Sequence, residues 1–127
     1  MKNSDLFRIL YVARNEDDHL LLSAMFDLPN LKITPADTFA EALRKSESEN
    51  FDLYLLETRL PDGDGFELCK IMRQSQPHTP IVFYSGDAAE AHKAKGLAVG
   101  ADAYLAKPYF ETLEKTLNQF IFSGNQN

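Results

Sequence analysis

The sequence predicts an α/β fold, a doubly wound, five-stranded parallel sheet with five helices, and three observations support this. Three short apolar runs are continuous rather than alternating, which is typical of strands buried on both faces of a parallel sheet. They occupy residues 9–12, 53–56 and 81–84. Segments of helix length, with apolar residues at helical spacing, lie between these runs. Strand and helix alternate five times, and right-handed crossovers turn such a chain into an open parallel sheet.

Turn and capping residues mark the limits of the helices. Pro29 and Asn30 end the first helix, Asp64 followed three residues later by Glu67 resembles a capping box, and Gly100 is a natural left-handed cap. Weaker strands are expected at residues 31–34 and 103–105. The helices are expected at residues 16–28, 39–48, from 64 onward, at 88–99 and at 109–122. We therefore expect a single domain over residues 1–127, with its core at about 7–122 and a polar tail at 123–127.

Two of the helices carry apolar residues that we expect to face the sheet. In the first helix these are Leu20, Leu21, Ala24, Met25 and Leu28. In the third they are Phe66, Cys69, Ile71 and Met72. Cys69 is most simply a small buried hydrophobic residue.

The composition is that of an ordinary soluble globular protein, with 44% hydrophobic and 25% charged residues. The net charge is −6 and no cluster of lysine and arginine stands out, so direct binding to nucleic acid is disfavoured. No apolar run is long enough to span a bilayer, and residues 1–7 lack the apolar stretch of a secretory signal. The single cysteine excludes an intrachain disulfide and suits a reducing compartment. We expect a cytoplasmic protein that does not bind membranes.

In an open parallel sheet, ligands bind at the carboxyl ends of the strands. Four of the expected strands end in residues that could form a site there. These residues are Ala13, Arg14 and Asn15; Glu57, Thr58 and Arg59; Ser85 and Gly86; and Lys107 with Pro108.

Three stretches in order, residues 52–65, 80–86 and 100–108, resemble the receiver domain of bacterial two-component response regulators. The resemblance extends over about residues 7–122. It implies a flavodoxin-like, CheY-like (βα)5 fold with strand order 2-1-3-4-5. It also implies a role in phosphorelay signal transduction rather than a catalytic activity of the chain's own.

Receivers carry an aspartate after the third strand, which takes a phosphoryl group from a kinase histidine. Two acidic residues after the first strand help to hold Mg²⁺, and a Ser/Thr and a Lys contact the phosphoryl oxygens. Phosphoryl transfer depends mainly on positioning and charge neutralisation, with the carboxylate as nucleophile. By this resemblance Ser85 and Lys107 match the phosphate pocket, and Tyr104 matches the switch aromatic residue.

Two positions depart from the family pattern. Glu57 occupies the acceptor position, and its carboxylate is displaced by one C–C bond, about 1.5 Å. Ala13 and Arg14 replace the acidic pair, although Mg²⁺ usually needs carboxylates to anchor it. We therefore expect a pseudo-receiver that is not phosphorylated and binds no Mg²⁺. We also expect Arg14 and Lys107 together to neutralise Glu57.

Another register of the first loop stays open. Glu16, Asp17 and Asp18 could supply the acidic pair if the loop were longer and the first helix about a turn shorter. The simpler interpretation places these acids in the first helical turn, where negative charge is favourable. The three histidines suggest no transition-metal site, because His19, His78 and His92 lie in separate segments.

The expected function is therefore protein–protein contact in a signalling pathway. A histidine kinase or a downstream effector is the expected partner, and a homodimer is possible. The contact face would comprise the fourth helix, fifth strand and fifth helix, including Lys93, Lys95, Tyr104 and Glu111. One alternative is a conventional Mg²⁺-dependent phosphoacceptor receiver. Another is a flavodoxin-like binding protein, although residues 13–15 lack a Gly-rich or Ser/Thr-rich phosphate loop.

Overall fold

A parallel sheet of five strands forms the centre of the molecule. The computed structural model describes residues 6–26 and 29–125, with side chains up to residue 121. The sheet has the order β2-β1-β3-β6-β7. Its strands are β1 (Phe7–Val12), β2 (Leu31–Ala36), β3 (Leu53–Leu56), β6 (Ile81–Ser85) and β7 (Ala103–Ala106).

Two very short strands, which the sequence pattern does not predict, form a separate antiparallel hairpin. These are β4 (Arg59–Leu60) and β5 (Gly63–Asp64). They account for the difference between the observed order and the predicted 2-1-3-4-5, because they take the fourth and fifth numbers along the chain. The turn of the hairpin also supports a neighbouring helix, since the Asp62 carboxylate accepts hydrogen bonds from the backbone N–H groups of Phe39 and Ala40 at 2.6 and 3.0 Å. These bonds lower the pKa of Asp62.

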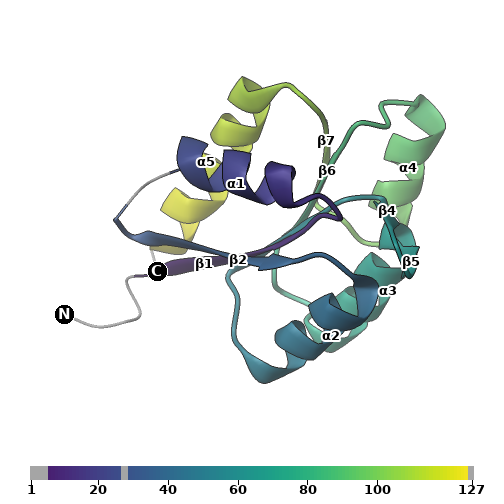
Figure 1. Cartoon of the computed structure of the whole chain (residues 1–127), viewed down its shortest axis with the longest axis horizontal. Coiled ribbons are helices and arrows are strands. Elements are labelled where there is room, and N and C mark those ends of the chain that lie inside the picture. The colour runs from purple at the N-terminus through teal and green to yellow at the C-terminus, as the bar shows by residue number, and fades with distance from the viewer. Residues whose placement is uncertain (1–5, 27–28, 126–127) are drawn as a thin grey trace.

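Five helices cover the two faces of the sheet. They are α1 (Glu16–Met25), α2 (Phe39–Ser48), α3 (Gly65–Ser75), α4 (Glu90–Ala98) and α5 (Phe110–Asn125). Helices α1 and α5 lie on one side, and α2 and α3 lie on the other with α4 next to α3 (Figure 1). Helix α5 continues through Asn125, so the predicted polar tail is helical as far as it is described, and residues 126–127 lie outside the described residues.

The continuous apolar runs fill both layers of the core. In β1, Ile9 and Tyr11 point to the side of α1 and α5, whereas Leu10 and Val12 point to the side of α2 and α3. None of these four side chains is more than 1% exposed. The run of apolar residues therefore reflects a strand with no solvent-facing side.

The predicted inner stripe of α1 is wrong. Leu20, Leu21 and Met25 are 62%, 60% and 45% exposed, and Ala24 is also exposed. Leu28 lies outside the described residues. The row of apolar residues that suggests a buried face is instead an outer face of the molecule.

The inner face of α1 contains a histidine. His19, Leu22 and Phe26 are buried, and these positions also follow helical spacing. The His19 ring meets the Tyr11 ring edge-on, with centroids 4.9 Å apart. Its Nε2 lies 2.7 Å from the carbonyl oxygen of Ala13, so its burial is supported by a hydrogen bond.

Helix α3 matches its prediction more closely. Phe66, Cys69 and Met72 are buried, Ile71 is half-buried, and Leu68 is buried as well. Asp64 caps the helix by accepting a hydrogen bond from the Phe66 N–H at 2.7 Å. Burial raises the pKa of the Cys69 thiol to about 11.

Gly65 allows the hairpin and α3 to lie directly on the end of β3. A Cβ at this position would lie 2.0 Å from the carbonyl oxygen of Glu57 and 2.9 Å from Cα of Thr58. We expect Gly65→Ala to lower the free energy of unfolding by about 3 kcal/mol, because the backbone must move to admit the methyl group. Urea denaturation followed by circular dichroism measures this change. The control is Gly86→Ala, where an added Cβ meets nothing within 4 Å, and equal stability of the two variants would contradict the prediction.

Candidate functional site

Backbone hydrogen bonds bring the ends of the strands together at one edge of the sheet. The N–H of Glu57 donates to the carbonyl oxygen of Val12 at 2.9 Å, and the N–H of Lys107 donates to that of Ser85 at 2.8 Å. The residues that follow β1, β3, β6 and β7 therefore line a common cleft. A cavity of about 430 Å³ lies here, and Arg14, Asp18, Glu57, Ser85 and Lys107 are among its lining residues.

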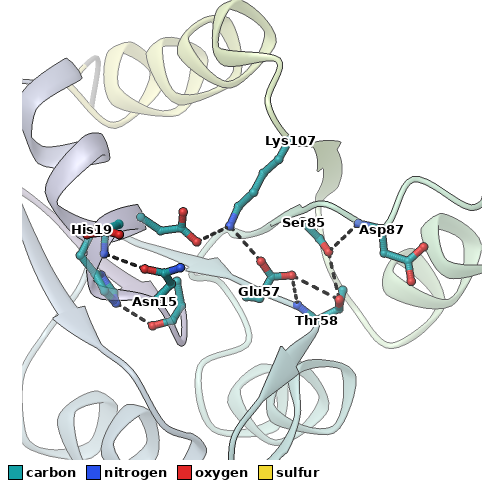
Figure 2. A network of polar contacts seen from close by, with 10 residues as sticks. Asn15, His19, Glu57, Thr58, Ser85, Asp87 and Lys107 are labelled. Carbon is teal, nitrogen blue, oxygen red and sulfur yellow. Dashed lines mark hydrogen bonds and ion pairs between the residues drawn. The ribbon is translucent and has the colours of Figure 1, made fainter.

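The Lys107 ammonium group bridges two carboxylates in this cleft. Its Nζ lies 2.9 Å from Oε1 of Glu57 and 2.9 Å from Oδ2 of Asp18. Figure 2 shows the Lys107 side chain extending from the end of β7 toward Glu57. The side chains of Lys107, Glu57 and Asp18 are only 19%, 13% and 34% exposed. We call these three residues the cleft triad.

The protonation of Lys107 reflects these neighbours. Burial opposes a positive charge, but Tyr11, Asp18 and Glu57 act in the other direction and hold the pKa of Lys107 above its usual range. Lys107 is therefore a fixed cation at any physiological pH.

The second oxygen of Glu57 is also occupied. Oε2 accepts hydrogen bonds from the N–H of Thr58 at 2.9 Å and from its hydroxyl group at 3.3 Å. The carboxylate is therefore held by Lys107 on one oxygen and by Thr58 on the other (Figure 2). Thr58 is among the strand-end residues expected at this edge of the sheet, although no specific contact is predicted for it, and it is only 4% exposed.

A chain of polar contacts continues from Thr58 to Tyr104. The hydroxyl oxygens of Thr58 and Ser85 are 3.0 Å apart, and the Ser85 oxygen accepts from the N–H of Asp87 at 3.1 Å. Tyr104 then donates its hydroxyl hydrogen to the carbonyl oxygen of Asp87 at 2.6 Å. Burial is the main reason that the pKa of Tyr104 is raised. Polar contacts thus connect Glu57, Ser85, Lys107 and Tyr104 in the structure.

Asp18 is a site residue that the sequence places in the cleft only under the alternative register of the first loop. The Asn15 side chain caps α1 by accepting from the N–H of Asp17 at 2.8 Å, so Asp18 lies in the first helical turn. Side chains on a helix lean toward its N-terminus, which here faces the cleft. The available signal is that Asp18 lies one helical turn after Arg14, although the sequence alone does not show which way the turn faces.

The prediction that Arg14 helps to neutralise Glu57 is wrong. Its side chain is exposed, and among the residues that the structure describes it has no carboxylate within 4.0 Å. Ala13 is fully buried after the end of β1, and Arg14 lies in the bend that follows it. Arg14 therefore lies at the rim of the cleft, and Asp18 rather than Arg14 is the second partner of Lys107.

Glu16, Asp17 and Asp18 agree in part with each of the two interpretations of the first loop, as an acidic pair in the cleft or as acids of the first helical turn. Glu16 and Asp17 are exposed in the first turn of α1, as the simpler interpretation predicts. Asp18 also belongs to this turn, but its carboxylate contacts the cleft. Within residues 6–26 and 29–125, no group of three or more His, Cys, Asp or Glu side chains is arranged to hold a metal ion. None of the helices described is long and apolar enough to cross a membrane.

A comparison with known families identifies this arrangement. Residues 9–118 match the family model described as the response regulator receiver domain. The chain belongs to this family. The receiver domain is 36% identical over 102 residues to the alkaline phosphatase synthesis transcriptional regulatory protein PhoP of Bacillus subtilis, a match that covers 80% of this chain and 42% of PhoP. It is 31% identical over 109 residues to the transcriptional regulatory protein ResD of the same organism, covering 86% of this chain and 45% of ResD.

Solved structures show the same fold. A two-component response regulator from Clostridium difficile superposes with a TM-score of 0.85 at 30% identity, covering 91% of this chain and 95% of that one. The chemotaxis response regulator CheY4 of Vibrio cholerae gives a TM-score of 0.82 at 31% identity, covering 91% and 98%. The receiver domain spans less than half the length of PhoP and ResD.

The cleft triad predicts a non-additive effect on stability. Asp18→Asn or Glu57→Gln alone leaves Lys107 one carboxylate, so we expect each to cost less than about 1 kcal/mol. The double variant leaves a largely buried ammonium without a carboxylate and should cost more than the sum of the two, with a coupling of about 1 kcal/mol. Urea denaturation of the four proteins measures the cycle. Asp17→Asn serves as a control with no contact to Lys107, and costs that simply add would show that the two acids do not share a cation.

The raised pKa of the buried Tyr11 phenol predicts that the protein loses stability at alkaline pH. Burial raises its pKa from 10.0 to about 12, so the folded protein keeps the phenol proton more tightly than the unfolded chain. Its contribution is fully present below pH 10 and is lost as the pH rises toward 12. We expect the wild type to lose more stability over this range than Tyr11→Phe, as measured by denaturation at a series of pH values. Parallel profiles for the two proteins would contradict this assignment.

Proposed function

We propose that this receiver domain signals through protein contacts without being phosphorylated. The observation that carries the proposal is the Lys107 ammonium group, which lies 2.9 Å from both Glu57 and Asp18. In the family pattern the corresponding lysine contacts a phosphoryl group. Here the lysine is already paired with two carboxylates of the chain itself.

The state of Glu57 supports this proposal. A carboxylate nucleophile needs a free oxygen that can reach the phosphorus atom, but Lys107 and Thr58 engage both oxygens of Glu57. The longer side chain also places the carboxylate about 1.5 Å from where an aspartate would hold it. A displacement of about 1 Å can cost on the order of a hundredfold in rate.

The donor set of the cleft does not fit a resident Mg²⁺ ion. Ala13 offers no side-chain donor, and Arg14 brings a positive charge to the rim. Three carboxylates line the cleft, but Asp18 and Glu57 share one ammonium group, and Asp87 lies 2.6 Å from Nδ1 of His92. Mg²⁺ needs oxygen ligands in near-ideal octahedral geometry, so it would have to displace Lys107 first. We therefore propose that the domain works without a metal ion.

The second candidate is a conventional Mg²⁺-dependent phosphoacceptor receiver. One observation favours it, because Asp18 places a second carboxylate in the cleft beside Glu57. This candidate requires Lys107 to release at least one carboxylate and Mg²⁺ to take its place.

Exposure to a phosphodonor decides between the two candidates. We expect no change in intact mass after the wild-type protein is incubated with Mg²⁺ and acetyl phosphate, because Glu57 is held on both oxygens. A stoichiometric gain of one phosphoryl group would establish the second candidate.

A rebuilt acceptor site provides the control for this experiment. The variant Ala13→Asp, Arg14→Asp, Glu57→Asp restores the family pattern and should bind Mg²⁺ and gain a phosphoryl group. Because Ala13 is fully buried, the double variant Arg14→Asp, Glu57→Asp is tested beside it. If both variants fold but neither responds to Mg²⁺, the acceptor site has been placed wrongly.

We propose that partners contact the face formed by α4, β7 and α5. Tyr104 lies under this face with its hydroxyl group turned inward to Asp87. A Cβ on Gly96 would lie 2.8 Å from the Tyr104 ring, so α4 packs closely over that side chain. A histidine kinase, a downstream effector or a second copy of the domain would suit a receiver in the cytoplasm.

A further inference from the structure

Three cations without carboxylate partners gather beside the cleft triad. Arg14 follows β1, Arg59 lies in β4, and Lys95 lies in α4. Across the described part of the chain, none of the three has a carboxylate within 4.0 Å, in contrast to Lys107. This cluster of three cations lies in a protein whose net charge is −6.

All three residues line the same cavity. Its volume is about 380 Å³, which lies in the range of small-ligand sites. Thr58 contributes to its wall, and Phe66 and His92 form another side. The Lys95 ammonium group rests 4.7 Å from the centre of the Phe66 ring, which orients it.

The two acids in the wall of this cavity are already engaged. The Asp64 carboxylate accepts the N–H of Phe66 at 2.7 Å, as the cap of α3. Asp87 lies 2.6 Å from Nδ1 of His92 and also accepts the N–H of Ala89 at 3.2 Å. Their negative charge is therefore partly satisfied within their own loops. Arg59 is near enough to Asp87 to help lower the pKa of that carboxyl group, but among the described residues none of the three cations has a carboxylate within 4.0 Å.

The cavity is continuous with the cleft but differs from it chemically. Arg14, Thr58, Arg59 and Asp87 line both spaces. At the cleft end, Lys107 is neutralised by Asp18 and Glu57, and an anion there would meet two carboxylates. At the other end, an anion would meet three cations, Arg14, Arg59 and Lys95, beside two acids that already accept hydrogen bonds from backbone N–H groups.

We propose that Arg14, Arg59 and Lys95 form a binding site for a phosphoryl dianion, either inorganic phosphate or a phosphate monoester. Guanidinium groups suit this ligand because their planar donors match phosphate oxygens in pairs. The ligand sits beside the hairpin rather than on Lys107, and no bond is made or broken.

Titration followed by amide NMR tests the site. Inorganic phosphate or glycerol 1-phosphate is added at constant ionic strength, with chloride as the balancing anion. We expect saturable shifts at Thr58, Arg59, Asp64 and Lys95, with affinity in the millimolar range. Tighter binding of the ester identifies a monoester as the ligand, and tighter binding of phosphate identifies the free anion; both support the site.

Matched variants locate the binding. We expect Arg59→Gln and Lys95→Gln each to weaken binding by up to about fivefold, because each removes one exposed charge. The control is Lys32→Gln, an exposed lysine on the edge strand β2, which should leave binding unchanged. Absence of saturable shifts would overturn the proposal, as would equal weakening by Lys32→Gln or shifts confined to Gly86 and Lys107. Neither probe is a phosphodonor, so the outcome is independent of whether Glu57 can be modified.

Discussion

The sharing of one ammonium group by two carboxylates is the interaction on which this cleft depends. Lys107 comes from the end of β7, Glu57 from the end of β3 and Asp18 from α1, so a single cation joins three parts of the chain. Two acids held this close would repel each other without it. The geometry also explains why the departures from the family pattern must be considered together. With Glu57 and Asp18 both present, the lysine is a structural counterion as well as a match to the phosphate pocket.

Much of the fold could be predicted because burial on both faces leaves a clear pattern. The strands at residues 53–56 and 81–84 are visible as continuous apolar runs, and the structure places them within β3 and β6. The hairpin of β4 and β5 escaped prediction because two-residue strands have no periodicity. The sequence does not identify the inner face of α1, because two rows of side chains fit helical spacing. The buried row contains His19, whose hydrogen bond to Ala13 replaces contact with water.

The candidate site could be predicted only in part. Glu57, Ser85 and Lys107 follow directly from strand ends, and the parallel sheet brings such ends together without further information. The partner of Lys107 depends on side-chain direction. Arg14 is nearer the strand end in sequence, but it is exposed in the bend after β1, whereas the carboxylate of Asp18, in the first turn of α1, contacts Lys107. Proximity along the chain was a poor guide at this point.

The buried thiol of Cys69 has a practical consequence for spectroscopy. Its side chain is fully enclosed on the inner face of α3, and its pKa of about 11 leaves almost no thiolate at neutral pH. Maleimide dyes and nitroxide spin labels react with the thiolate, so the native residue should stay unlabelled while the protein is folded. A cysteine introduced on any outer helix would then carry a single probe, and the core would need no alteration to make room for it.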